Sequence, residues 1–151
     1  RELEAAFDGN VGVSVRMTQL VLDGMLARGW GRIVIITSVW GREAGGAPAY
    51  NAAKAAEISV VTSLAREVAS RGVTVNAIAP GSILWYGGGW DRRQKTDPEG
   101  IAEFVRRDMP LGRFGTVEEV AGVTAFVCSM QASLLNGACI AVDGGQSRSN
   151  I

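Results

Sequence analysis

"RIVIITSVWGREAGGAPAYNAAKAA", residues Arg32–Ala56, is the stretch of sequence that decides the fold. It opens with a short continuous run of β-branched residues, Arg32–Ser38, which predicts a strand buried on both faces. A glycine-rich loop follows, and the alanine-rich segment from Ala49 to about Ser70 then predicts a long helix that ends at "SRG". A buried strand that leads into a helix is the repeating unit of a protein built on a parallel sheet.

The segments on either side continue this alternation. Before the first strand, strong helix formers extend from about Glu2 to Arg28, and Gly29 suits the C-cap of that helix. After the long helix, "VTVNAIAP" (Val73–Pro80) predicts a second buried strand. Near the end of the chain, "ACIAVDGG" (Ala138–Gly145) predicts a third strand that closes in a turn.

Two further helices are predicted between the second and third strands. One covers Pro98–Asp108, and the other begins after Thr116, which forms a capping-box pattern with Glu119. The intervening residues 82–98 carry three consecutive glycines and are the least regular part. The sequence therefore predicts a single α/β unit with a parallel sheet and flanking helices.

The composition excludes several classes of protein. At 151 residues, 47% hydrophobic and 20% charged, the chain is typical of one globular domain. Fifteen basic residues balance fifteen acidic ones, so we expect no electrostatic binding of nucleic acid or of a membrane. The "DRR" cluster at Asp91–Arg93 is interpreted as a solvated helix face. Cys128 and Cys139 lie in apolar runs, and we expect buried free thiols of a cytoplasmic protein.

Ser38, Tyr50 and Lys54 form the candidate reactive group. Tyr50 and Lys54 are four residues apart, so on a helix they share a face. A phenol has an ordinary pKa near 10, and a neighbouring ammonium lowers it by favouring the phenolate. Such a tyrosine can serve as general acid toward a carbonyl or general base toward an alcohol. The alternative, from spacing alone, is a packed ring beside a solvated lysine tip.

Several ordered motifs favour the catalytic interpretation. "SVWGREAGGAPAYNAAKAA" resembles the catalytic segment of the short-chain dehydrogenases/reductases, in which a serine precedes Tyr-x-x-x-Lys by about a dozen residues. "AREVASRGVTVNAIAPGSI" and "PLGRFGTVEEVAGVTAFVCS" resemble later segments of the same family, and "NGACIAVDGG" resembles its last strand. The nearest branch is the one that resembles 3-oxoacyl-carrier-protein reductase. The resemblance covers essentially the whole chain.

This resemblance implies specific roles in ketone–alcohol interconversion by hydride transfer with NAD or NADP. Tyr50 would be the acid/base, Lys54 would lower its pKa and bind the nicotinamide ribose, and Ser38 would hold the substrate oxygen. Asn10 falls where the family has an asparagine that holds a water in a proton relay. The alternative for Asn10 is a helix residue that bonds its own backbone.

The resemblance also implies contacts to the cofactor from the end of the second strand. Pro80, Gly81 and Ile83 match the segment that approaches the nicotinamide, with Ile83 acting mainly through its backbone. A plain strand-ending turn would equally explain Pro80–Gly81. At the position of Trp85 the family often has a threonine that contacts the nicotinamide carboxamide. We do not expect that contact from Trp85. Trp85, Tyr86 and Trp90 would form either a mobile aromatic lid or a hydrophobic cluster under the loop.

The family's cofactor half is missing from the sequence. No strand followed by the glycine-rich pyrophosphate turn T-G-x-x-x-G-x-G is present. Residues 1–151 are therefore expected to be the C-terminal, catalytic portion of a doubly wound, Rossmann-type sheet. The resemblance implies a homodimer or homotetramer, with the helices over Glu2–Arg28 and Ala49–Ser70 packing against partner copies. The alternative function is a non-catalytic module that only self-associates.

Overall fold

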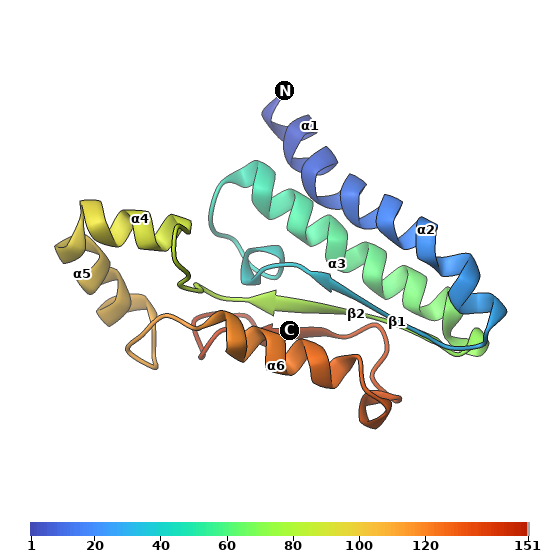
Figure 1. Cartoon of the computed structure of the whole chain (residues 1–151). Helices are drawn as coiled ribbons and strands as arrows, with labels where there is room; N and C mark the ends of the chain where they lie inside the picture. The colour runs from blue at the N-terminus through green and yellow to red at the C-terminus, as the bar shows by residue number, and fades with distance from the viewer. Residues whose placement is uncertain (151) are drawn as a thin grey trace.

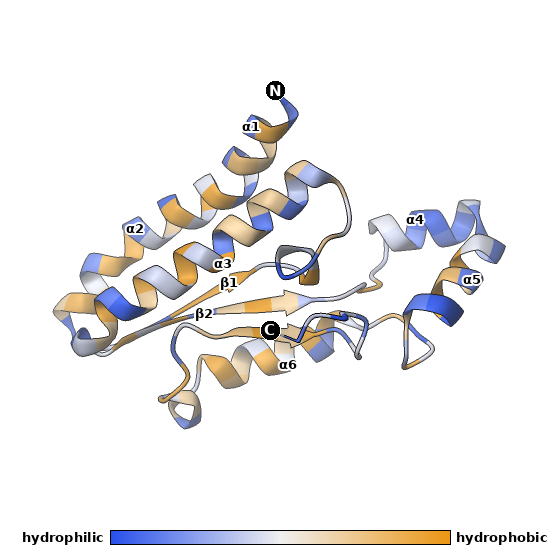
Figure 2. Ribbon diagram, turned by 180° about the vertical axis from the view of Figure 1, so that it is seen from behind, coloured by the Kyte–Doolittle hydropathy of each residue, from blue (hydrophilic) through white to orange (hydrophobic). Residues whose placement is uncertain are grey.

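A three-stranded parallel sheet lies between two layers of helices (Figure 1). The computed structural model describes residues 1–150. The strands β1 (Gly31–Ile36), β2 (Val73–Pro80) and β3 (Cys139–Val142) follow each other in the order β1-β2-β3. The α2 and α3 helices cover one face of the sheet and α6 covers the other (Figures 1 and 2). The α/β prediction with a parallel sheet and flanking helices is thus confirmed.

The helices fall into three groups along the chain. The first is a nearly continuous rod that contains one π-helical segment, Asp8–Gly12, and the second is the long helix after the candidate reactive loop. The third comprises two short helices beyond the end of the sheet and one on the face opposite α2 and α3. Their bounds are α1 Glu2–Phe7, α2 Val13–Ala27, α3 Pro48–Val68, α4 Gly89–Thr96, α5 Pro98–Asp108 and α6 Val117–Val127.

The core is packed around β2, the central strand. Its residues from Val73 to Ala79 are all buried. Val73, Val75 and Ala77 pack against a row of α3 side chains, including the fully buried Val61. Burial of a side chain such as Val61 contributes roughly 1.5–3 kcal/mol. One polar residue on the strand, Asn76, is buried but satisfied, because its amide bonds the carbonyl of Leu135 and the N–H of Ala138.

The structure corrects several predicted boundaries. The first strand ends at Ile36 rather than Ser38, because Ser38 is the N-cap of a 3₁₀ turn at Val39–Gly41 and its Oγ accepts from the Trp40 N–H at 3.2 Å. The third strand stops at Val142.

The segment after β2, predicted as irregular, contains α4. The Asp91 carboxylate stabilises its first turn by accepting from the Gly87 N–H and from Lys95. Polar residues dominate α4, which is why no apolar periodicity revealed it (Figure 2).

Glycine is required where two chain reversals meet. Gly72 ends the turn after α3 with φ +76°, and a Cβ there would lie 2.1 Å from the carbonyl oxygen of Gly29. Gly29 itself has φ +68° after α2, as predicted for a C-cap glycine. These two glycines allow both helices to return directly into neighbouring strands.

A buried ion pair on α3 is hydrogen-bonded to α2. Lys54 Nζ lies 2.8 Å from Glu57 Oε2, and the Ser14 hydroxyl donates to Glu57 Oε1 at 2.7 Å. The two charged side chains are 10% and 2% exposed. Lys54 Nζ also donates to the carbonyl of Ile36 at 3.1 Å, so the pair additionally connects α3 to the end of β1. Among residues 1–150, no helix is both long and apolar enough to span a membrane.

Removal of the Glu57 carboxylate is expected to destabilise the fold. Glu57→Ala leaves the buried Lys54 ammonium without its counter-charge, and we expect a loss of roughly 3–5 kcal/mol in the free energy of unfolding. Glu67→Ala, at an exposed position of the same helix, is expected to change it by less than about 0.5 kcal/mol. Urea denaturation measures both. Equal stability of the two variants would contradict a structural role for the pair.

The N-terminus of α6 makes a second stability prediction. Thr116 Oγ1 accepts from the Glu119 N–H and the Glu119 carboxylate accepts from the Thr116 N–H, as the sequence predicted. Thr116→Ala is expected to cost about 1 kcal/mol. The hydrogen bond from Arg113 lowers the pKa of Glu119 from 4.5 to about 2.

Because the folded pKa is the lower one, Glu119 stabilises the fold above pH 4.5 and this contribution is lost between pH 4.5 and about 2. Denaturation as a function of pH should therefore show a shallower acid slope in Glu119→Gln than in the wild type. Glu118→Gln, at the exposed neighbouring position, is the control and should keep the wild-type slope. A wild-type slope in Glu119→Gln would argue against this linkage.

Candidate functional site

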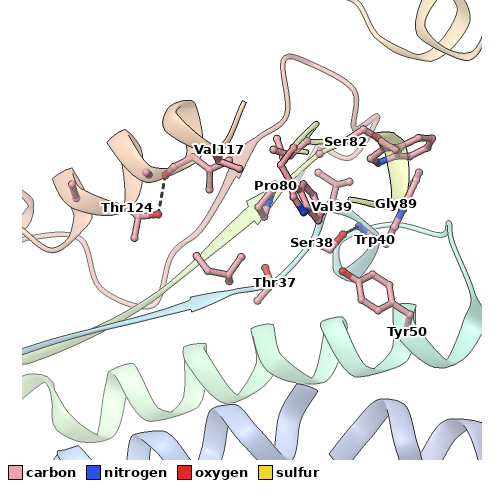
Figure 3. A pocket seen from close by; sticks show the side chains of 18 of the residues that line it. Thr37, Ser38, Val39, Trp40, Tyr50, Pro80, Ser82, Gly89, Val117 and Thr124 are labelled. Atoms are coloured by element: carbon pink, nitrogen blue, oxygen red, sulfur yellow. Dashed lines mark hydrogen bonds between the residues drawn. The ribbon is translucent and has the colours of Figure 1, made fainter. Parts of the chain in front are cut away.

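A cavity of about 890 Å³ opens at the carboxyl ends of β1 and β2. Open parallel sheets bind ligands at this edge. The structure brings five of the predicted site residues to the cavity wall, namely Ser38, Tyr50, Pro80, Gly81 and Ile83 (Figure 3). They come from the turn after β1, the first turn of α3, the last residue of β2 and the segment that follows β2. Lys54 and Asn10 do not line the cavity.

Ser38 and Tyr50 face each other across the cavity wall. Figure 3 shows the Tyr50 hydroxyl pointing toward Ser38. Ser38 is buried at 7% exposure, whereas Tyr50 is 36% exposed and accessible from the cavity. Ser38 is fixed in place because its Oγ also accepts from the Trp40 N–H. The two hydroxyls can therefore bind the same oxygen atom of a small molecule.

Asn51 holds the loop that carries Ser38 against α3. Its side-chain amide donates to the carbonyls of Trp40, Glu43 and Gly45. Gly41 lets the same loop approach the helix, since a Cβ there would lie 2.7 Å from the backbone of Lys54. Sequence reasoning missed Asn51, although its position beside Tyr50 at the start of a helix was a usable signal for a loop-binding amide.

Lys54 lies one turn beyond Tyr50 with its ammonium below the tyrosine ring. Lys54 Nζ is 5.6 Å from the ring centroid of Tyr50. Its hydrogen bonds go to the Ile36 carbonyl and to Glu57 rather than to the cavity. The shared helix face predicted from the i, i+4 spacing is thus present. Glu57, which the sequence analysis did not single out, is the direct partner of Lys54.

Asn10 lies in the π-helical segment between α1 and α2. Its amide donates to the Ala6 carbonyl at 2.8 Å, which is the backbone bonding that the sequence analysis held as the alternative. The π-helical segment packs against α3. Within residues 1–150, no hydrogen bond joins the Asn10 side chain to Ser38, Tyr50 or Lys54.

The segment Pro80–Ile83 has both a structural role and free backbone groups. A Cβ at Gly81 would lie 2.6 Å from Gln146, whose amide also bonds Ser82, so the turn is tightly packed against the end of the chain. Ile83 forms a parallel bridge with Gly115 through the backbone groups of its neighbours Ser82 and Leu84. The N–H and carbonyl of Ile83 itself make no backbone hydrogen bond among the described residues.

The aromatic residues after β2 divide between the two predicted arrangements. Trp90 stacks on Phe104 at 4.8 Å and lies 5.2 Å from Phe114, so it belongs to a hydrophobic cluster under the loop. Trp90 also lines the cavity, as does Trp85, which is 50% exposed. Tyr86 is 93% exposed and does not line it.

Three residues of the cavity wall were misjudged or missed from the sequence. Arg93 is exposed, as the solvated-face interpretation predicts, but it also lines the cavity, and Trp40 had no predicted role. Cys128 was expected to be buried but is exposed at the cavity. Cys139 is half-buried, and that burial raises the pKa of its thiol.

Comparison with known proteins identifies the family. Residues 1–147 match the family model described as "Enoyl-(Acyl carrier protein) reductase". The chain is 41% identical to the 3-oxoacyl-[acyl-carrier-protein] reductase FabG of Pseudomonas aeruginosa over 137 residues, which is 90% of this chain and 53% of that protein. It is 35% identical to the acetoacetyl-CoA reductase of Cupriavidus necator, over 94% of this chain and 56% of that protein. The chain thus spans about half the length of these relatives.

Solved structures give the same result. The L-sorbose reductase of Gluconobacter frateurii, complexed with NADPH and L-sorbose, matches with a TM-score of 0.89 and 30% identity over 97% of this chain and 59% of that one. An oxidoreductase of Burkholderia thailandensis, described as a short-chain dehydrogenase/reductase, matches with a TM-score of 0.88 and 38% identity over 95% and 56%. The fold, the order of the motifs and these matches agree, and the chain belongs to the short-chain dehydrogenase/reductase family.

Proposed function

We propose that the protein containing this chain is an NAD(P)-dependent oxidoreductase that interconverts a ketone and a secondary alcohol. The observation that carries this proposal is the pair of facing hydroxyls, Ser38 and Tyr50, on the wall of a cavity at the carboxyl edge of the sheet. A carbonyl oxygen bound between them would be polarised by two hydrogen bonds. Reductases and dehydrogenases among the relatives support the same reaction class.

In the reduction direction, Tyr50 acts as the general acid. The nicotinamide supplies the hydride to the carbonyl carbon when the cofactor is bound. Tyr50 Oη gives its proton to the carbonyl oxygen, so that the ketone becomes a secondary alcohol. Ser38 holds the oxygen by a hydrogen bond throughout. In the oxidation direction Tyr50 takes the proton from the alcohol instead.

Lys54 and Asn10 would act behind Tyr50. Lys54 would assist Tyr50 from beneath its ring, where the buried ammonium lies 5.6 Å from the ring centroid. To reach a nicotinamide ribose, Lys54 would exchange one of its present hydrogen bonds, to Ile36 or Glu57, for the ribose hydroxyls. Asn10 would hold a relay water through its side-chain oxygen Oδ1, because its side-chain nitrogen Nδ2 already donates to the Ala6 carbonyl.

The residues present fit the nicotinamide end of NAD or NADP. The backbone N–H and carbonyl of Ile83 make no backbone hydrogen bond among the described residues and suit a carboxamide, which carries one acceptor and two donors. Pro80 and Gly81 line the cavity beside Ile83. The printed sequence contains no glycine-rich turn for the pyrophosphate. Structures of relatives contain NADP or NADPH, which supports this cofactor class.

A second candidate function is self-association without catalysis. The α1–α2 rod carries exposed apolar side chains, including Leu20 at 78% and Met17 at 57% exposure. The β1 edge opposite β2 pairs with no strand among residues 1–150. We propose a homodimer or homotetramer in which these helices and α3 pack against partner copies. For the 151-residue chain alone, sedimentation as a monomer would contradict self-association.

The decisive test of the oxidoreductase proposal is Tyr50→Phe. We expect kcat for ketone reduction with NADPH or NADH to fall by about 10²–10⁴-fold, because general acid catalysis is lost. Binding of the cofactor, measured by quenching of its fluorescence, should be retained. Tyr86→Phe, at an exposed site outside the cavity, is the control and should keep wild-type kcat. A wild-type rate in Tyr50→Phe would refute the assignment.

A further inference from the structure

We infer that the substrate of this site is a ring-bearing ketone or alcohol with one carboxylate, and that Arg93 binds the carboxylate. This inference rests on the proposed function and adds the substrate class. It follows from two properties of the cavity wall, its charge and its aromatic content.

The charge of the described cavity wall comes from Arg93. Among the side chains of residues 1–150 that line the cavity, Arg93 is the charged one, and none is an aspartate or glutamate. Its guanidinium lies 5.0 Å from the ring centroid of Trp90. Within residues 1–150, no carboxylate forms an ion pair with Arg93. Arg93 is exposed and lines the same cavity as the two hydroxyls, and a positive charge there without a carboxylate partner favours a substrate with a single negative charge.

Neighbouring cations on α4 and α5 differ from Arg93 in this respect. Arg92 donates to the Gly87 carbonyl and Lys95 pairs with Asp91. On α5, Arg106 pairs with Glu103 and Arg107 pairs with Asp108. Among these cations of α4 and α5, Arg93 is thus the one whose guanidinium N–H groups have no protein acceptor within residues 1–150. A guanidinium supported by an indole face leaves its planar fork of donors free for a carboxylate.

The aromatic content of the wall defines the rest of the substrate. Trp40, Trp85 and Trp90 all line the cavity, and the chain has four tryptophans in total. Trp90 is held by its stack on Phe104, so it offers a fixed surface. Val117, Val120 and Ala121 of α6 add apolar lining. Flat apolar rings prefer such surfaces, whereas a polyhydroxylated sugar would find few polar partners on them.

Two matched ketones test the inference. 4-Acetylbenzoate and 4-acetylbenzamide share a ring and a ketone and differ in one negative charge. We expect 4-acetylbenzoate to bind at least about tenfold more tightly than 4-acetylbenzamide, because hydrogen bonds to a charged partner are stronger than those to a neutral one. Calorimetric titration of the Tyr50→Phe variant measures this binding without turnover. Arg93→Gln should abolish the difference, and Arg106→Gln, whose arginine is exposed and paired on α5, should preserve it.

The ring surface is tested separately. Trp85→Ala should weaken the binding of both ketones by about two- to tenfold, because each loses the same stacking surface. Trp30→Ala removes an exposed tryptophan that does not line the cavity, and should leave both affinities unchanged. Equal affinities for the two ketones in the protein with Arg93 intact would overturn the inference, as would an undiminished difference in Arg93→Gln.

Failure of this inference can be told apart from failure of the proposed function. If both ketones are reduced with equal kcat/KM, the oxidoreductase proposal stands and the carboxylate class is wrong. If 4-acetylbenzoate binds preferentially through Arg93 but neither it nor any other ketone is reduced, the binding class stands and the reaction is wrong. Reduction of 4-acetylbenzoate with a kcat/KM at least tenfold above that of 4-acetylbenzamide supports both.

Discussion

The burial of β2 from Val73 to Ala79 is the constraint on which the rest of the structure depends. A strand enclosed on both faces and both edges must satisfy every backbone group through its neighbours. β1 and β3 provide that pairing in parallel register. The loop before β3 completes it, because Asn136 Oδ1 accepts from the Val75 N–H and the Gly137 N–H donates to the Val75 carbonyl. Since α3 and α6 cover opposite faces of the strand, its carboxyl end is where both layers open. The cavity occupies that opening, with Pro80 and Gly81 at the end of the strand.

The two facing hydroxyls, of Ser38 and Tyr50, are positioned by backbone contacts rather than by each other. Ser38 is set by the 3₁₀ turn that it caps, and Tyr50 by the first turn of α3. The link between them is Asn51, which binds three carbonyls of the intervening loop, together with the close approach that Gly41 permits. Such rigid support fixes the geometry of a site before any ligand arrives. Lys54 contributes from beneath the tyrosine ring, where it is enclosed by protein.

The sequence predicted the strands and the long helices well because their apolar patterns are periodic and long. Five residues that it predicted for one site, Ser38, Tyr50, Pro80, Gly81 and Ile83, all line one cavity, since parallel strands bring their carboxyl ends to one edge. It missed α4, whose polar composition hides the helical period, and it placed Cys128 inside although α6 presents that residue to the cavity. Arg93 and Glu57 could not be assigned from the sequence. Glu57 matters because packing places it against Lys54, and Arg93 because packing places no carboxylate against it within residues 1–150.

The contacts among Ser14, Lys54 and Glu57 have a consequence for how such a protein can diverge. Glu57 accepts from both of the other side chains, so each of the three positions is chemically defined by its neighbours. An apolar residue at 57 is compatible with the packing only if Ser14 no longer needs an acceptor and Lys54 gains another one. Substitutions at these sites are therefore expected to occur together in natural sequences, with position 14 in one helix covarying with position 57 in another. A lineage that alters its substrate can vary the other side chains of the cavity wall while Lys54 is kept and positions 14 and 57 change together.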